Sequence, residues 1–503
     1  MINLIQKSLN RSRTENGAVG YQTTGNALLD LNYNVSSLRR ASEDEIIHFF
    51  KKAYYELPDY TVKWLFFARD IRGGLGERRL FRICYKQLAE LNSTLFIKNL
   101  DLISEYGRWD DLVSLLGISK VTDEHIINLI QTQLNIDLEN VRQDKPVSLL
   151  AKWLPSENAS SKRTKELART VRGYLGLSSK EYRRMLSLLR RYSKVLEVEL
   201  CNNEWENIDY ERVPSLANLK YKNAFLRHDS DRRREYLNSL SKGTAKMNMG
   251  AATPVDIVSK YTMSGLWSNN VKSYDETLEL AWENLKDINV RDTLVVADGS
   301  GSMLTMVNTN TTALDVANAL AIYTSEQNTG AYRNKYITFS HSPQFVDLPD
   351  YLTLNDKLNA CLKHNECSNT NIEAVFDLIL HLAVEHDIPQ RRMIKNILII
   401  SDMEFDAAQT HFGGRYGSNP LTPRLFDEIQ ARYESKGYKL PRLIFWNVNS
   451  RTKTIPLIEN ELGVTLVSGF SQNVLRMVMS NKYDPWEVLK EQLDNERYKM
   501  VQT

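Results

Sequence analysis

Apolar positions in the first part of the chain recur with the period of an α-helix. Ser42 and Glu45 have the spacing of a capping box, and apolar residues follow them at intervals of three and four. Ser178 and Glu181 repeat this arrangement ahead of a second such run. Many helices with short polar connections predict an α-helical region over residues 1–285, either a bundle or a solenoid-like or ring-like repeat. The chain shows no clean repeat at a fixed period.

From about residue 290 the apolar positions form short continuous runs rich in β-branched residues. The runs occupy residues 293–297, 336–339, 396–401 and 442–446. Helical patterns separate them at residues 313–323, 372–383 and 424–433. Continuous apolar strands are buried on both faces, which is typical of a parallel sheet covered by helices. The alternation predicts a doubly wound α/β domain over residues 286–480, followed by a charged helix over residues 481–503.

Oxygen-bearing side chains follow two of these predicted strands. Asp298 ends the first strand and opens the turn Asp298-Gly-Ser300-Gly-Ser302, while Asp402 follows the strand at residues 396–401. Thr370 precedes a predicted helix and offers a further hydroxyl. Ligands of open α/β sheets bind beyond the carboxyl ends of the strands. Carboxylate and hydroxyl oxygens suit a hard cation, so these five residues predict a site for Mg²⁺ or another divalent cation. The alternative is a domain that keeps the turn without the metal.

The order of these groups resembles the metal-ion-dependent adhesion site of von Willebrand factor A domains. Asp298-x-Ser300-x-Ser302, a later Thr370, and Asp402 after an apolar strand carry the resemblance. It implies a von Willebrand A fold over residues 286–480. It also implies that an acidic group from a partner completes the coordination of the cation.

Several stretches of the helical region resemble a little-characterised family that couples such a region to a C-terminal A domain. They lie at residues 14–18, 69–79, 106–111, 152–157 and 220–225. The layout is similar to the Ro autoantigen and its TROVE module. That resemblance implies a ring of HEAT-like helical repeats that is closed by the A domain and binds small structured RNA.

The net charge of +2 hides an uneven distribution of charge along the chain. Residues 151–250 hold 21 Lys and Arg against 12 Asp and Glu, whereas residues 291–503 hold 21 against 25. The first segment is basic enough to attract a polyanion. Solvated helix faces would give the same counts.

Four basic groups are the candidate RNA contacts. They are Arg69, Arg72, Arg78 and Arg79, then Lys162, Arg163 and Lys165, then Arg183, Arg184, Arg190 and Arg191, and finally Arg232, Arg233 and Arg234. The first group flanks a glycine-rich break that would suit phosphates, or that is a helix–helix turn with local ion pairs. The third group has pairs seven residues apart, which predicts one helix face that follows a phosphate backbone.

Familiar enzyme motifs are missing from the sequence. It holds no His-Glu-x-x-His helix, no Gly-x-Ser-x-Gly elbow and no Walker-type loop. Cys361, His364 and Cys367 lack the fourth ligand of a structural zinc site. Four cysteines fit a reducing cytosol, and neither a signal peptide nor an apolar run long enough to span a membrane is evident. A cytoplasmic protein without a membrane partner is expected.

These patterns together predict a non-enzymatic, RNA-binding ribonucleoprotein component similar to the Ro family, with a Mg²⁺-binding A domain. One alternative is a protein-interaction scaffold whose cation recruits an acidic partner. A further alternative is a metal-dependent nuclease or other hydrolase. The sequence does not indicate an oligomeric state.

Overall fold

The computed structural model describes residues 9–265, 268–285, 287–339, 342–365, 371–407 and 424–503. The chain forms two compact units, each built from two separate stretches. One unit, called the sheet unit, combines residues 1–61 with residues 249–495. The other, called the helical unit, combines residues 62–248 with residues 496–503. The predicted boundary at residue 285 therefore differs from the observed ones, because residues 1–61 and 249–285 belong to the same compact unit as the sheet.

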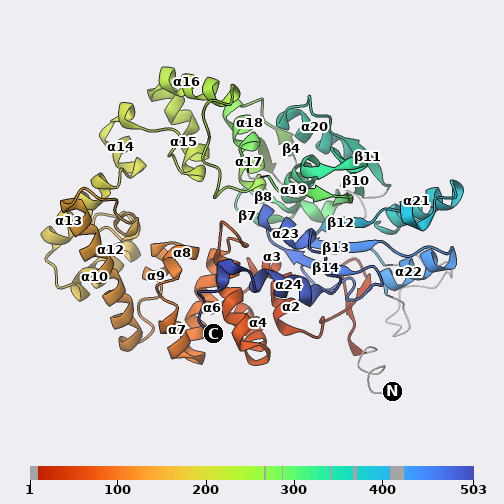
Figure 1. The fold of residues 1–503 in the computed structure, drawn as a ribbon, viewed down its shortest axis with the longest axis horizontal. Coiled ribbons are helices and arrows are strands. Elements are labelled where there is room, and N and C mark those ends of the chain that lie inside the picture. Colours follow the sequence, from red (N-terminus) through yellow and green to blue (C-terminus); the bar gives the residue numbers. More distant parts are fainter. Residues whose placement is uncertain (1–8, 266–267, 286, 340–341, 366–370, 408–423) are drawn as a thin grey trace. The chain divides into compact units, whose positions relative to one another are not determined.

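The sheet unit is built around one six-stranded, mostly parallel sheet (Figure 1). Its strands along the chain are β6 (Thr293–Asp298), β10 (Lys335–Phe339), β11 (Gln344–Asp347), β12 (Asn396–Ser401), β13 (Arg442–Asn447) and β14 (Val464–Ser468). Their order in the sheet is β11-β10-β6-β12-β13-β14, and only β11 pairs antiparallel with its neighbour. The chain thus grows outward from β6 in one direction and from β12 in the other. The gap between the carboxyl ends of β6 and β12 is the topological switch point, where ligands of such sheets bind.

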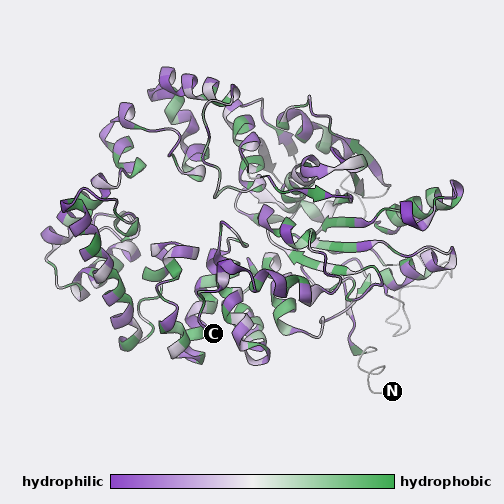
Figure 2. Ribbon diagram, in the orientation of Figure 1, coloured by the Kyte–Doolittle hydropathy of each residue, from purple (hydrophilic) through white to green (hydrophobic). Residues whose placement is uncertain are grey.

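Apolar strands and covering helices form the core of this unit. Every residue of β6, β13 and β14 is buried, and Figure 2 shows the central strands mostly in the hydrophobic colour. Helix α19 (Ala313–Gln327) packs on β6, β10 and β12. The other helices along this part are α17 (Pro254–Tyr261), α18 (Glu276–Glu283), α20 (Leu354–His364), α21 (Glu373–Glu385), α22 (Leu425–Ser435), α23 (Leu475–Val478) and α24 (Pro485–Leu493). The predicted alternation of strand and helix is confirmed.

The N-terminal residues contribute to the sheet unit rather than to a helical domain. They form α2 (Ala27–Tyr33), α3 (Val35–Leu38) and α4 (Glu43–Glu56), and α2 packs against β14. Asn447 Nδ2 donates to the carbonyl of Tyr33 at 2.9 Å, and the hydroxyls of Ser36 and Ser468 lie 2.9 Å apart. These buried polar contacts fix the N-terminal helices to the sheet.

Short two-stranded ladders complete the sheet unit. They pair β1 (Ser12–Arg13) with β2 (Val19–Gly20), β3 (Thr262–Gly265) with β4 (Ser268–Val271), β5 (Val290–Arg291) with β9 (Asn328–Thr329), and β7 (Met306–Asn308) with β8 (Thr311–Thr312). The β1–β2 segment also bridges Gly17 to Asp406 and Tyr21 to Ile455, in the loops after β12 and β13. The N-terminal segment therefore lies at the carboxyl edge of the sheet.

The helical unit confirms the prediction of an N-terminal helical region. Helix α5 (Pro58–Arg69) crosses into it. Its further helices are α6 (Arg78–Leu91), α7 (Ser93–Lys98), α8 (Ile103–Tyr106), α9 (Trp109–Val113), α10 (Lys120–Arg142), α11 (Leu150–Trp153), α12 (Lys162–Tyr174), α13 (Ser179–Tyr192), α14 (Leu196–Asn202), α15 (Ser215–His228) and α16 (Ser230–Ser241). They range from 4 to 23 residues, so they share no common length. Among the described helices of the chain, none is long and apolar enough to cross a membrane.

Candidate functional site

Asp298 lies at the carboxyl end of β6, and its carboxylate is held from both sides. Oδ1 accepts the backbone N–H of Ser300 at 2.9 Å, and Oδ2 accepts the hydroxyl of Ser401 at 2.6 Å. The side chain is buried. The turn needs Gly299 because a Cβ there would lie 2.7 Å from Thr338 Oγ1. The close approach of Thr338, and not a left-handed backbone, explains the glycine.

The two serines of the turn bring their hydroxyls together beside this carboxylate. Ser300 Oγ and Ser302 Oγ are 3.0 Å apart. Two adjacent ligands of an octahedral Mg²⁺ ion, each about 2.1 Å from the metal, lie about 3 Å apart. The spacing of the two hydroxyls therefore fits a pair of neighbouring Mg²⁺ ligands.

Asp402 brings the second carboxylate to the same switch point from the end of β12. It is fully buried, and its Oδ1 accepts the backbone N–H of Glu404 at 3.2 Å. Its Oδ2 accepts no hydrogen bond from the described residues, although Arg451 Nη2 lies 3.4 Å away. A buried carboxylate oxygen without a hydrogen bond is costly, and a cation would compensate it. This oxygen and the hard-oxygen donor set fit a divalent cation of the Mg²⁺ type.

Burial shifts the acidity of both carboxyl groups. It raises the pKa of Asp298 to about 6, although hydrogen bonds from Ser300 and Ser401 act in the opposite direction. Burial and then the charge of Asp298 raise the pKa of Asp402 to about 7, whereas Arg451 lowers it. Both shifts have the same origin, since water that would solvate the negative charges is excluded.

We expect this pair to make the cation-free protein less stable as the pH rises from about 4 to about 7. In that window the folded state holds protons that the unfolded chain has already released, so the free energy of unfolding falls with increasing pH. The measurement is the urea midpoint against pH in the presence of a chelator, for the wild type and for Asp298→Asn. The midpoint of the wild type should fall more steeply than that of the variant. A wild-type midpoint that rises relative to the variant would contradict the assignment.

Glu404 is a buried acid beside the candidate cation site that the sequence analysis did not single out. It is fully buried in the loop after β12. Its carboxylate accepts the backbone N–H groups of Glu15 at 2.7 Å, Arg451 at 2.7 Å and Thr452 at 2.9 Å. The hydroxyl of Thr452 donates to it as well. Through these hydrogen bonds Glu404 connects the N-terminal segment to the loops after β12 and β13, next to the candidate metal ligand Asp402.

Arg451 is the second residue that was missed. Its guanidinium lies 2.6 Å from Glu15 and donates to Thr305 Oγ1 at 3.1 Å, in addition to its contact with Asp402. Their positions in the sequence could have indicated both residues. Glu404 follows β12 and Arg451 follows β13, so both lie at the carboxyl edge of the sheet. The order of strands in the sheet was needed to use this signal.

The remaining predicted ligand, Thr370, lies outside the described residues. Within the described part of the chain, no three side chains of His, Cys, Asp or Glu come together as a metal-binding group. A site at Asp298 and Asp402 thus depends on hydroxyl oxygens as well as on its two carboxylates. Cys361 is buried, and Nδ1 of His364 lies 2.9 Å from the Gln344 side chain.

Several predicted RNA contacts are engaged inside the helical unit. Arg69 is buried and pairs with Asp111 at 2.7 Å. The guanidinium of Arg190 donates to the carbonyls of Ala151 and Leu154, at 2.8 Å each. Arg233 is also buried and donates to Asn218, and it packs on three aromatic rings. Arg69 and Arg233 are therefore structural residues and not RNA contacts, because buried guanidinium groups need internal partners. Arg190 is half-buried, and its guanidinium is engaged by the two carbonyls.

The other candidates of the first, second and last groups are spread over the helical unit. Arg72 and Arg78 are more than half exposed, with Glu105 at 3.9 Å and Asp110 at 4.0 Å respectively. Arg79, Lys162, Arg163 and Arg234 are exposed and Lys165 is half-buried. Arg69 does not join Arg72 and Arg78 in an open phosphate cradle, since it pairs inside the unit with Asp111. The helix–helix turn with ion pairs is the interpretation that this part of the structure favours.

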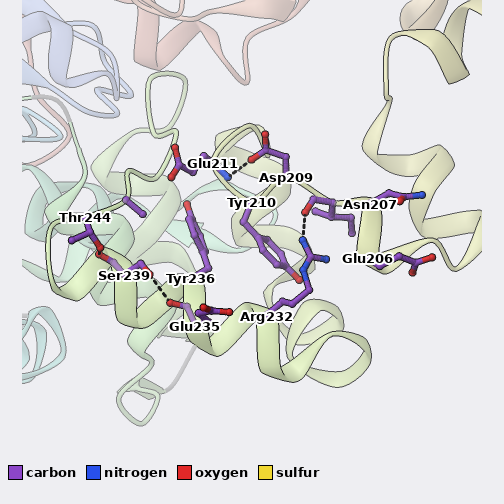
Figure 3. A pocket seen from close by; sticks show the side chains of 12 residues that line it. Glu206, Asn207, Asp209, Tyr210, Glu211, Arg232, Glu235, Tyr236, Ser239 and Thr244 are labelled. Atoms are coloured by element: carbon purple, nitrogen blue, oxygen red, sulfur yellow. Dashed lines mark hydrogen bonds between the residues drawn. The ribbon is translucent and has the colours of Figure 1, made fainter.

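Arg232 lies in an acidic hollow and not on a basic face. The hollow measures about 570 Å³, and Figure 3 shows the side chains that line it. They include four carboxylates, those of Glu206, Asp209, Glu211 and Glu235. Arg232 itself donates to the carbonyl of Ile208 at 2.7 Å. Four carboxylates repel phosphate, so the prediction that Arg232 contacts RNA is wrong.

Helix α13 carries the basic residues that the structure does bring together. Lys180, Arg183, Arg184, Arg190 and Arg191 line one hollow of about 620 Å³. Arg183, Arg184 and Arg191 are exposed. The single carboxylate among the lining residues, Glu157, pairs with Arg172 at 2.9 Å. We call Lys180, Arg183, Arg184 and Arg191 the α13 basic surface.

Comparison with known proteins identifies relatives of nearly the whole chain. Residues 14–131 and 122–293 match the model described as "Domain of unknown function (DUF2828)". Residues 292–502 match the model described as "Domain of unknown function (DUF7788)". The chain is 30% identical to "Uncharacterized protein L728" of Acanthamoeba polyphaga mimivirus over 521 residues, covering 95% of this chain and 86% of the viral protein. The chain therefore belongs to the DUF2828 family, and the region matched to that family is followed here by the DUF7788 region, which holds Asp298 and Asp402.

Proposed function

We propose that this protein binds small structured RNA through the α13 basic surface, and that its sheet unit is a von Willebrand A-type domain with a Mg²⁺ site. One observation supports RNA binding most strongly. Four cationic side chains that the structure leaves at the surface line one hollow, next to an acid that is already paired. A phosphate backbone is a polyanion that such a cationic surface attracts.

The arrangement favours recognition of shape over recognition of sequence. Arginine forks bind phosphate oxygens in pairs, and these contacts carry no information about the bases. Double-stranded RNA is read mainly through its backbone. The resemblance to the Ro family, in which a helical ring binds small structured RNA, supports the same proposal. A ring built from helical repeats stays a prediction, as does a cytoplasmic location.

Charge reversal on α13 tests the RNA proposal. We expect Arg183→Glu with Arg184→Glu to weaken binding of a structured RNA about tenfold or more, because two phosphate contacts become repulsive. The slope of log affinity against log salt should become shallower by about 1.8, for two duplex phosphate contacts at about 0.9 each. The measurement is fluorescence anisotropy of a labelled hairpin RNA over a range of salt concentrations.

The matched control reverses two charges elsewhere on the helical unit. Arg142→Glu with Lys145→Glu makes the same change of net charge at exposed positions outside the α13 hollow. The control should retain most of the affinity and the slope of the wild type. Equal losses in both double variants would mean that net charge alone attracts RNA, and would contradict a site on α13.

A second candidate function is recruitment of an acidic protein partner through the cation. Two observations favour this function. Asp402 Oδ2 accepts no hydrogen bond from the described residues, and the hydroxyls of Ser300 and Ser302 lie next to each other. Asp298, Ser300, Ser302 and Asp402, called the cation site from here on, would hold the ion. The bound ion would supply a positive charge that attracts a carboxylate. Capture of a partner should then require Mg²⁺ and be lost on chelation, whether or not RNA is present.

A further inference from the structure

Arg451 lies where it competes with a cation. Its Nη2 is 3.4 Å from Asp402 Oδ2, the oxygen that accepts no hydrogen bond from the described residues. Its Nη1 donates to Thr305 Oγ1, and Thr305 Oγ1 in turn donates to the carbonyl of Ser302. The guanidinium therefore reaches both the carboxylate and the serine turn of the cation site. A divalent ion there would compete for the same oxygen and would repel the guanidinium.

Glu15 holds Arg451 in this position. Its carboxylate lies 2.6 Å from Arg451 Nε, and its backbone N–H donates to buried Glu404 at 2.7 Å. Residues on either side of Glu15 attach to the same loop: Thr14 Oγ1 donates to the carbonyl of Phe405, and Asn16 Nδ2 to that of Glu404, both at 2.6 Å. The N-terminal segment 14–18 is thus connected to Asp402 through one guanidinium.

We propose that Arg451 is a built-in competitor of the divalent cation and couples the cation site to segment 14–18. Entry of the cation displaces the guanidinium from Asp402 and loosens the segment. Attachment of the segment weakens cation binding by the same factor, because coupling between two equilibria is reciprocal. The inference rests on the cation site of the proposed function.

The displaced arginine has a consequence for partner recognition. A cation at Asp402 and the freed guanidinium would present two neighbouring positive charges at the carboxyl edge. Such a pair suits the carboxylate of an acidic side chain. Glu15 is the internal carboxylate that occupies the guanidinium when the segment is attached. An acidic partner would therefore compete with Glu15 and bind best to the cation-loaded protein.

The test compares Mg²⁺ binding by calorimetry in the full chain and in Arg451→Gln. We expect the variant to bind Mg²⁺ about tenfold more tightly, because the competing charge is gone. Lys453→Gln is the matched control, since it removes a positive charge two residues away that pairs with Glu45 instead. The control should change the affinity less than about twofold, as expected for a partly exposed charge outside the site.

Hydrogen exchange supplies a readout that does not depend on affinity. Saturating Mg²⁺ should increase amide exchange in segment 14–18 of the wild type and leave the exchange of Arg451→Gln unchanged. If the wild type binds Mg²⁺ and Arg451→Gln binds it equally or less tightly, the coupling is wrong while the cation site stands. If the wild type binds no Mg²⁺, the cation site and the coupling fall together. A segment whose exchange ignores Mg²⁺ in the wild type would also overturn the coupling.

Discussion

Asp298→Asn is expected to lower the affinity for Mg²⁺ by about 100-fold or more. Loss of groups that only support metal ligands already costs about 10–100-fold, and Asp298 is proposed as a direct ligand. Asparagine keeps the size of the side chain and an oxygen that can accept the Ser300 N–H, so the turn should survive. What it loses is the negative charge that a buried cation requires.

Calorimetry of Mg²⁺ binding checks this expectation, with Asp292→Asn as the control. Asp292 immediately precedes β6, whereas Asp298 ends it. Asp292 has a positive φ of 47°, which asparagine tolerates, and it pairs with Lys395 at the other edge of the sheet. The control should bind Mg²⁺ like the wild type. Wild-type affinity in Asp298→Asn would place any Mg²⁺ site elsewhere.

Glu404→Ala is expected to lower the free energy of unfolding of the sheet unit by about 3–5 kcal/mol, because several buried donors lose their acceptor at once. The three backbone N–H groups come from residues 15, 451 and 452, so three segments lose a common anchor. Replacement of one hydrogen bond would cost only about 1 kcal/mol. The larger value reflects donors that stay buried without a partner.

Urea unfolding followed by tryptophan fluorescence measures the effect. The matched control is Glu434→Ala on α22, where the glutamate is exposed and accepts one side-chain bond from Gln430. A change within about 0.5 kcal/mol is expected there, as for most surface substitutions. A similarly small loss in Glu404→Ala would mean that the N-terminal segment and the two loops hold together without this carboxylate.

The strands of the sheet were predictable because burial on both faces leaves a clear signal in the sequence. Residues 294–297 and 397–400 are apolar without interruption, and each run is soon followed by the acid that the structure brings to the switch point, Asp298 and Asp402 respectively. The partners of amphipathic helices leave no comparable signal. The apolar face after Ser42 predicts a helix, and α4 begins directly after this cap as expected. The pattern does not indicate that α4 belongs to the sheet unit.

The cation site was partly predictable for the same reason. Asp298 and Asp402 each follow a strand, so their meeting follows from the topology of a doubly wound sheet. Arg451 and Glu15 were not predictable, since their contact joins residues 436 positions apart and requires the path of the N-terminal segment. The basic residues show the opposite limit. Heptad spacing places Arg183 and Arg190 on one face of α13, yet Arg190 donates to the carbonyls of Ala151 in α11 and of Leu154 just after it.

The most direct test of the central claim is the affinity of the unaltered protein, freed of copurified nucleic acid, for a labelled hairpin RNA at two salt concentrations. The α13 basic surface has four exposed cationic side chains, those of Lys180, Arg183, Arg184 and Arg191. Four contacts with duplex phosphates predict that affinity falls roughly 150-fold between about 50 and 200 mM salt. Affinity with that steep dependence is the result that RNA binding predicts. No measurable affinity at the lower salt concentration would contradict it and leave the cation-dependent acidic partner as the function of the chain.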